Sequence, residues 1–66
     1  MNQQVAKVTK VNIWLQDLTK NPVQLSLVGY VRDVDEASGM LKVLYECDAE
    51  ARVGKHAYFF TCETAQ

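Results

Sequence analysis

The sequence has little cysteine and little histidine, and this scarcity removes two common ways of stabilising a short chain. Two cysteines, Cys47 and Cys62, are too few for a disulfide-rich scaffold. With one histidine, His56, and no CxxC spacing, the chain has no zinc-binding motif. We therefore expect two reduced, packed thiols and no structural metal.

Long apolar runs and an excess of one charge are also absent. No stretch of about 18 apolar residues could span a bilayer. The start of the chain, MNQQVAKVTKV, lacks the apolar core and the small-residue cleavage site of a secretion signal. The net charge of −1 and the pI near 5.6 give no overall field that would draw the chain to nucleic acid or to an anionic membrane. We expect a soluble, cytoplasmic protein with no membrane partner.

The chain has one proline, and it contains no repeat, linker or low-complexity tract. Pro22 follows Asn21, a pair that marks a turn, and residues 1–66 are expected to form a single small domain. Folding at this size buries roughly 60% of the surface of the unfolded chain, which leaves a small core. Because disulfides and metals are not available, we expect a homo-oligomer as the further source of stability.

Alternation of apolar and polar residues predicts the first two strands. The first covers Val11 to Leu15, and upstream of it the phase slips, so that residues 1–10 could extend the strand or form a short helical turn. The second strand runs from Val23 to about Val34, and its apolar set changes parity near Gly29. This change predicts a β-bulge or a sharp bend at the glycine.

The segment from Gly29 to Tyr45 is typical of a β-hairpin. Its four-residue connection, EASG, has glycine in the last place, where a loop built on a type I turn needs a left-handed residue. In this register Asp33 faces Lys42 as an ion pair between strands. The third strand is then expected from Met40 to Cys47.

A fourth strand is predicted in the segment KHAYFFTCE, residues 55–63. The preceding DAEARVG could be one helical turn or an open loop that ends at Gly54. Four or five strongly twisted antiparallel strands in so short a chain predict an all-β small barrel, SH3-like or Sm-like, with an OB-like barrel as the alternative. Apolar side chains on both faces of the strands favour closure, because a flat sheet with two apolar faces would aggregate unless it curled up or met a partner.

The residues do not form a pattern that catalysis or metal binding requires. The sequence places no serine or cysteine where His56 could activate it, so a strand histidine at a surface or interface is the simpler interpretation. The acidic segments RDVDE and ECDAE lack the DxDxDG spacing of a calcium loop and are better explained as solvated turn carboxylates. We expect no enzymatic activity, no catalytic residue, no metal and no cofactor.

The aromatic residues allow two interpretations. Trp14 shares a predicted strand face with Lys10, and the aromatic run at residues 58–60 follows Lys55 and His56. Exposed rings beside positive charge can stack on the bases of single-stranded nucleic acid. Alternatively, the same rings are buried in the core or in a subunit contact, and the seven basic residues are scattered rather than arranged in a stripe. The predicted nucleic-acid contacts are Lys10, Trp14, Lys55 and His56, and the predicted interface residues are Leu44, Tyr58, Phe59 and Phe60.

Two segments resemble a known family. GKHAYFFT, residues 54–61, is similar to the second Sm motif of the bacterial Hfq branch of Sm-like RNA-binding proteins. VQLSLVGYVRDVD, residues 23–35, resembles the bent second strand of that family. The resemblance implies a ring of subunits joined edge to edge through the last strands. It also implies that Lys55 and His56 point to a central pore that takes uridine-rich RNA.

Three binding functions are compatible with these features. The first and favoured one is single-stranded RNA or nucleic-acid binding by an Sm-like or OB-like oligomer. The second is a protein-interaction adaptor or small inhibitor that presents an edge strand or an apolar face, which the acidic pI favours. The third is a small-molecule binder in which the ligand lies where subunits of an oligomer meet.

Overall fold

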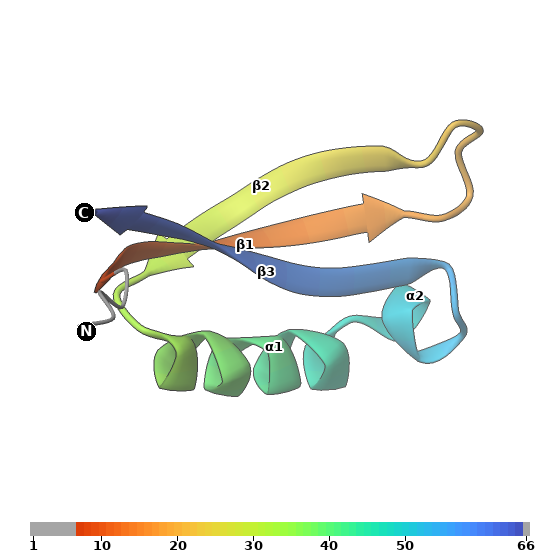
Figure 1. Ribbon diagram of the computed structural model, residues 1–66. Helices are drawn as coiled ribbons and strands as arrows, with labels where there is room; N and C mark the ends of the chain where they lie inside the picture. Colours follow the sequence, from red (N-terminus) through yellow and green to blue (C-terminus); the bar gives the residue numbers. More distant parts are fainter. Residues whose placement is uncertain (1–6, 66) are drawn as a thin grey trace, which may run out of the picture.

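The protein is a helix-covered antiparallel sheet, seen in a computed structural model that describes residues 7–65 (Figure 1). The strand-rich, antiparallel class expected from the sequence is confirmed. Closure into a barrel of four or five strands is not seen, because the described residues form an open three-stranded sheet. The elements in chain order are β1 (Lys7–Asp17), β2 (Gln24–Val31), α1 (Val34–Cys47), α2 (Ala49–Arg52) and β3 (His56–Ala65).

The central strand is β1, which pairs antiparallel with both neighbours in the order β2-β1-β3. Its register with β2 shifts by one residue: Ile13 lies opposite Gly29, whereas Trp14 lies opposite Leu27. Val28 is therefore an extra residue on β2. This confirms the bulge predicted near Gly29, and it explains the change of parity, because one extra residue reverses the faces of all residues beyond it.

The strand β1 begins earlier than the alternation predicted. A second register shift separates Val8, which lies opposite Thr64, from Lys10, which lies opposite Glu63. The slip of phase upstream of Val11 is thus an irregularity within one continuous strand from residue 7. Residues 1–6, for which an extension or a helical turn was expected, lie outside the described residues.

The hairpin predicted from Gly29 to Tyr45 and the third strand predicted from Met40 to Cys47 are wrong, because residues 34–47 form the helix α1. The side chain of Asp33 accepts a hydrogen bond from the backbone N–H of Glu36 at 2.8 Å. The carboxylate of Glu36 in turn accepts one from the backbone N–H of Arg32 at 3.0 Å. Such reciprocal bonds satisfy free N–H groups at a helix start, so the acidic residues assigned to a turn begin a helix.

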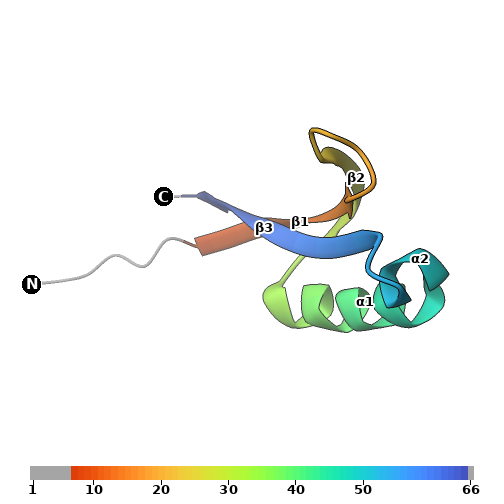
Figure 2. The ribbon, with the colours of Figure 1, turned by 90° about the vertical axis from the view of Figure 1, so that its right-hand side faces the viewer.

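The core lies between one face of α1 and one face of the sheet (Figure 2). Val11 and Ile13 of β1 are fully buried against Ala37 of α1. Apolar residues three or four positions apart on α1 continue this contact, which is the spacing of one helical face. The half-buried residues packed around the centre are Val8, Val31, Met40, Leu41, Leu44 and Phe60.

The segment after α1 is a helical turn, one of the two alternatives left open by the sequence. Asp48 accepts a hydrogen bond from the backbone N–H of Glu50 at 2.9 Å and begins α2. Gly54, with φ of 81°, adopts a left-handed conformation beyond the end of α2. The prediction that Gly54 ends this segment is confirmed.

Both cysteines are free, as predicted, but they are exposed rather than packed. Cys47 is the last residue of α1, and Cys62 lies on the edge strand β3. The packed environment was expected because free cysteines are among the residues most often buried. No helix in residues 7–65 combines the length and the apolar character needed to cross a membrane.

Substitution of two glycines tests whether residues 34–47 form a helix or a hairpin. Gly39 lies in the interior of α1, is exposed, and has open space within 4 Å of the position that a Cβ would occupy. Because alanine favours a helix interior over glycine, Gly39→Ala should raise the free energy of unfolding in urea by about 0.5–1 kcal/mol. In a hairpin turn that needs a left-handed glycine, the same change would lower it.

The matched control is Gly54→Ala. Its site is equally open, but its positive φ disfavours any residue with a Cβ, so this variant should lose about 1 kcal/mol. Stabilisation of both variants, or destabilisation of both, would contradict the assignment of α1.

Candidate functional site

The sheet face opposite α1 carries a group of apolar and aromatic side chains, here called the open face. Residues directly opposite each other in an antiparallel pair share a face. Trp14 lies opposite Phe59 on β3 and opposite Leu27 on β2, whereas its neighbour Ile13 is buried against the helix. Among the described residues the helices lie on one side of the sheet (Figure 2), so the other side is left to Trp14 and its neighbours.

Trp14 and Phe59 form the centre of the open face. Their ring centroids are 6.4 Å apart and their planes differ by 16°, so the two rings lie side by side in nearly the same orientation. The indole Nε1–H of Trp14 donates a hydrogen bond of 2.9 Å to Oγ1 of Thr61. This bond holds the indole in one orientation. Both rings are half-buried, and they form a rigid aromatic surface.

Tyr30 and Lys10 extend this surface toward the end of β2. Tyr30 is 65% exposed, and the Nζ of Lys10 lies 4.7 Å from the centroid of its ring, within the range of a cation–π contact. Leu25 and Leu27, 51% and 55% exposed, lie on β2 opposite Gln16 and Trp14. The open face is therefore an aromatic strip with an exposed aliphatic margin.

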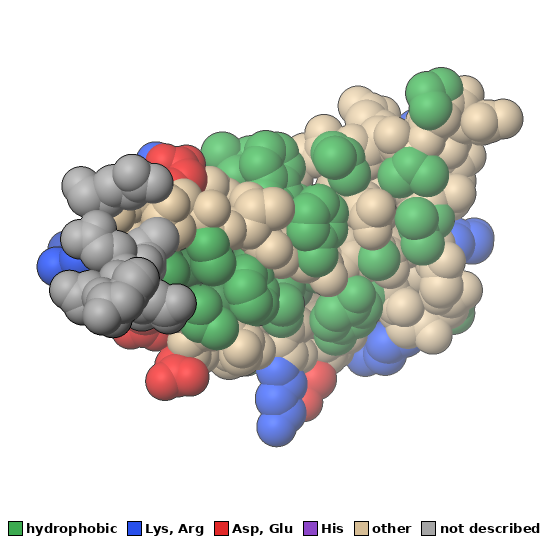
Figure 3. Space-filling model, in the orientation of Figure 1, with side chains coloured by type: hydrophobic (Ala, Val, Ile, Leu, Met, Phe, Trp, Pro, Cys, Tyr) green, Lys and Arg blue, Asp and Glu red, His purple; other side chains and the backbone are tan. Residues whose placement is uncertain are grey.

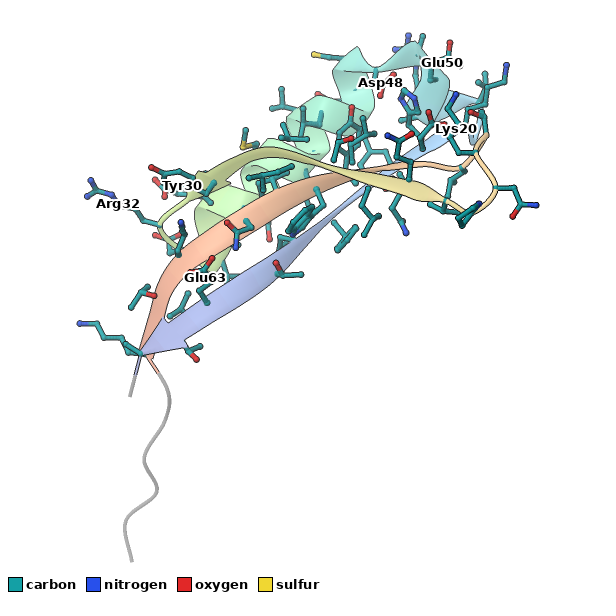
Figure 4. All side chains as sticks on the ribbon, turned by 90° about the horizontal axis from the view of Figure 1, so that it is seen from above. Lys20, Tyr30, Arg32, Asp48, Glu50 and Glu63 are labelled. Carbon is teal, nitrogen blue, oxygen red and sulfur yellow. The ribbon has the colours of Figure 1, made fainter. Side chains whose placement is uncertain are left out.

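Charge is distributed unevenly between the strands and the helices. Residues 7–32 contain four basic residues and one acidic residue, whereas residues 33–55 contain six acidic and three basic residues. Seen from above (Figure 4), Tyr30 and Arg32 lie near one end of the sheet, and Lys20 lies in the loop at the other end. The β1–β2 hairpin is thus the basic part of a chain whose net charge is −1.

The exposed apolar surface is visible in the space-filling view. On the side shown in Figure 3, hydrophobic side chains gather over the strands, and the charged side chains lie toward the ends and the lower margin of the molecule. One acidic group near the open face, Glu63, accepts a hydrogen bond of 2.9 Å from the side-chain amide of Asn12. This bond gives the carboxylate a partner within the protein.

A second polar group lies on the helix side of the sheet, around Asp48. One oxygen of its carboxylate, Oδ2, is 2.8 Å from Nδ1 of His56 and accepts a 2.6 Å hydrogen bond from the hydroxyl of Tyr58. The hydroxyl of Tyr45 accepts from the backbone N–H of Tyr58 at 2.9 Å, and the two tyrosine rings meet edge to face. Asp48 therefore ties the end of α1 to the start of β3.

These contacts change the acidity of all three side chains. Hydrogen bonds from Tyr58 and His56 lower the pKa of Asp48 to about 2. The bond to Asp48 raises the pKa of His56 above its ordinary value of 6.5, with smaller contributions from Asp17 and Glu50. Donation to Asp48, together with burial, raises the pKa of Tyr58 to about 12. The arrangement favours a carboxylate between a protonated imidazole and a neutral phenol.

The contact between the carboxylate of Asp48 and His56 was not predicted from the sequence. It could orient the imidazole as in a general-base pair. In residues 7–65, however, no serine, threonine or cysteine side chain is hydrogen-bonded to His56. The hydrogen bonds of Asp48 with His56 and Tyr58 are explained by a structural role, in which they link the end of α1 to β3.

The structure separates the four predicted nucleic-acid contacts into two pairs. Lys10 and Trp14 share the open face, as predicted. Lys55 lies in the turn before β3, where its Nζ is 4.0 Å from a carboxylate oxygen of Glu50, and His56 is bound to Asp48. The two pairs are separated, because Lys10 and Trp14 lie on the face opposite α1, whereas Lys55 and His56 contact acidic residues of the helical side.

The four predicted interface residues are divided in the same way. Leu44 and Phe60 pack against the core, and Tyr58 is bonded to Asp48, so these three stabilise the subunit itself. Phe59 points to the open face with Trp14. Tyr30, Leu25 and Leu27 were not predicted as site residues, because large apolar residues of a strand are expected to face the core.

The described residues contain no group of three or more histidine, cysteine, aspartate or glutamate side chains that could hold a metal ion. Comparison of the chain with protein-family models, with curated proteins and with solved structures found no match in any of the three.

The Asp48 cluster predicts a pH dependence of stability. Because the pKa of His56 is raised on folding, the protonated form stabilises the folded state; this contribution is complete below pH 6.5 and is lost as the pH rises through the raised value. The pKa of Asp48 is lowered, so its contribution is present above pH 3.8 and is lost as the pH falls toward 2. The urea concentration at which half of the protein is unfolded should therefore decrease as the pH is raised above 6.5.

His56 is the only histidine, so His56→Gln should abolish this decrease near neutral pH. Lys55→Gln, which removes an exposed charge from the adjacent residue, is the matched control and should keep the wild-type profile. An unchanged profile in His56→Gln would show that the contact with Asp48 does not affect stability.

Proposed function

We propose that the chain is a non-enzymatic binding module whose open face binds single-stranded nucleic acid, with RNA as the favoured ligand. The observation that carries this proposal is the pair of parallel rings, Trp14 and Phe59, on adjacent strands of a sheet face opposite the helices. Tyr30, with Lys10 at its ring, adds a third aromatic group beside a positive charge. Stacking on such rings contributes about 1–3 kcal/mol per base and does not depend strongly on sequence.

The distribution of charge supports the same face. Nucleic acid needs cations near the stacked bases, and the β1–β2 hairpin carries most of its charge as lysine and arginine. The excess of acidic residues is in the segment 33–55, which forms the helical side. A phosphate backbone along the open face would therefore run close to Lys10 and away from the carboxylates of α1.

An Sm-like ring with Lys55 and His56 at a pore, as the Hfq resemblance implies, stays a prediction, as does a cytoplasmic location. The ring would need His56 to contact RNA while it is bound to Asp48. Lys55 has a weak ion pair with Glu50, since both side chains are more than half exposed, and it is available to other partners. Nucleic-acid binding at the open face does not require Lys55 or His56.

The second candidate function is protein interaction, and the exposed aliphatic side chains favour it. Leu25 and Leu27 contribute apolar area without hydrogen-bonding groups, which suits an apolar protein surface better than a nucleotide. A small-molecule site between subunits is a further prediction from the sequence. Quenching of Trp14 fluorescence by oligouridine would favour nucleic acid over protein as the ligand.

Trp14 is the only tryptophan, so its fluorescence reports directly on the open face. Titration with single-stranded oligouridine should quench this fluorescence, and the affinity should fall as salt is raised. Phe59→Leu keeps the apolar character but removes one ring, and it should weaken binding by about tenfold or more. Circular dichroism of the variant checks that the fold is retained.

Two lysines provide a matched pair of equal charge. Lys10→Gln removes the cation beside Tyr30 and should reduce the slope of log affinity against log salt by about 0.7. Lys42→Gln, on the exposed side of α1, should leave the slope unchanged. Equal effects of the two changes, or no quenching by oligouridine at low salt, would contradict nucleic-acid binding at this face.

A further inference from the structure

The edge strand β2 lacks the features that normally prevent an exposed strand from pairing with another chain. Its eight residues, QLSLVGYV, include no charged residue and no proline. In the order β2-β1-β3 one side of β2 is bonded to β1, and no strand of the described residues pairs with the other side. Charges, proline or a covering segment are the usual protections of such an edge.

The side chains of β2 are exposed on both faces of the sheet. Leu25 and Leu27 project on the open face, and the bulge residue Val28 is also exposed, as is Val23 just before the strand. The helix contacts β2 mainly through Val31, which packs at the margin of the core.

The other edge strand, β3, differs in its charge and in its contacts with the helical side. It carries His56 and Glu63, and its residues Tyr58 and Phe60 are engaged by the helical side. The fully buried apolar side chains of the described residues are limited to Val11, Ile13 and Ala37. An additional partner along β2 would thus cover apolar surface that the chain does not cover itself.

From these observations we infer that β2 pairs antiparallel with β2 of a second copy of the chain. An identical strand is a suitable partner because the segment is uncharged: antiparallel self-pairing brings each residue near a neutral one, so no like charges are opposed. Such a contact is self-complementary about a two-fold axis and closes at two subunits. In the register that places Ser26 opposite its own counterpart, residues 24–28 pair, and at about 3.3 Å per residue these five residues give a ladder about 16 Å long.

The pairing joins two three-stranded sheets into one sheet of six strands. The two-fold axis of an antiparallel pair is perpendicular to the sheet, so both α1 helices lie on one side and both open faces lie on the other. The two aromatic strips then belong to one continuous surface. The dimer does not depend on the proposed nucleic-acid function, and either could hold without the other.

Sedimentation equilibrium over a range of concentrations tests the inference. The wild type should approach twice the chain mass of 7.5 kDa. Ser26, which is exposed and lies at the two-fold axis of this pairing, should tolerate a charge in the monomer but not opposite its counterpart. Ser26→Lys and Ser26→Asp should each raise the dimer dissociation constant by at least about tenfold. An equimolar mixture of the two variants should recover a dimer, because opposite charges then face each other.

Thr64→Lys places the same charge on the other edge strand, at an exposed residue, and should leave the dimer unchanged. Circular dichroism of the Ser26 variants establishes that they are folded as monomers. A wild type that is monomeric at all concentrations would overturn the inference. So would a dimer that persists in both Ser26 variants but dissociates in Phe59→Ser, since that result would locate the contact on the open face.

Discussion

A single helix packed on one face of a three-stranded sheet is the constraint on which the rest of the structure depends. Val11 and Ile13 of the central strand are buried against Ala37, whose small side chain allows the helix to approach the sheet closely. Among the described residues, α1 is the one helix long enough for this purpose. Since it covers one face, the opposite face and the edge of β2 keep their apolar side chains in contact with solvent.

The cluster around Asp48 connects this core to the open face. Asp48 follows α1, begins α2 and holds His56 and Tyr58 at the start of β3. Because side chains alternate along a strand, a residue held toward the helix directs its neighbour away from it. The contact of Tyr58 with Asp48 therefore orients Phe59 toward Trp14. A polar link on one side of the sheet supports an aromatic surface on the other.

The two proposed interactions use different properties of the exposed strands. The open face offers the planar surfaces of Trp14, Phe59 and Tyr30 next to a lysine, which suits stacked bases. The edge of β2 offers backbone hydrogen-bonding groups without charge, which suits another strand. These surfaces do not compete, because stacking occurs above the sheet and strand pairing occurs within its plane.

The sequence by itself determined the three strands of the sheet and the positions of their irregularities, but it also predicted a strand where α1 lies. Strict alternation from Val11 to Leu15, the parity change at Gly29 and the aromatic run after Lys55 predicted β1, the bulge and β3, since these signals depend only on the two-residue period of a strand. The same alternation placed Lys10 and Trp14 on one face. The helix was not predicted because the apolar residues of segment 34–47 fit the spacing of a strand as well as that of a helix. In addition, Asp33 and Glu36, which cap the helix, were interpreted as residues of a turn.

Which face of each strand is buried was decided by the tertiary structure alone. Periodicity divides β3 into Tyr58 with Phe60 and Phe59 with Thr61, but both sets contain an aromatic ring, so their hydropathy does not distinguish inside from outside. The position of α1 makes that distinction. It buries Phe60, leaves Phe59 on the open face, and brings Asp48 to His56 across a separation of eight residues. Local periodicity contains no information about which side of a sheet a later helix will cover.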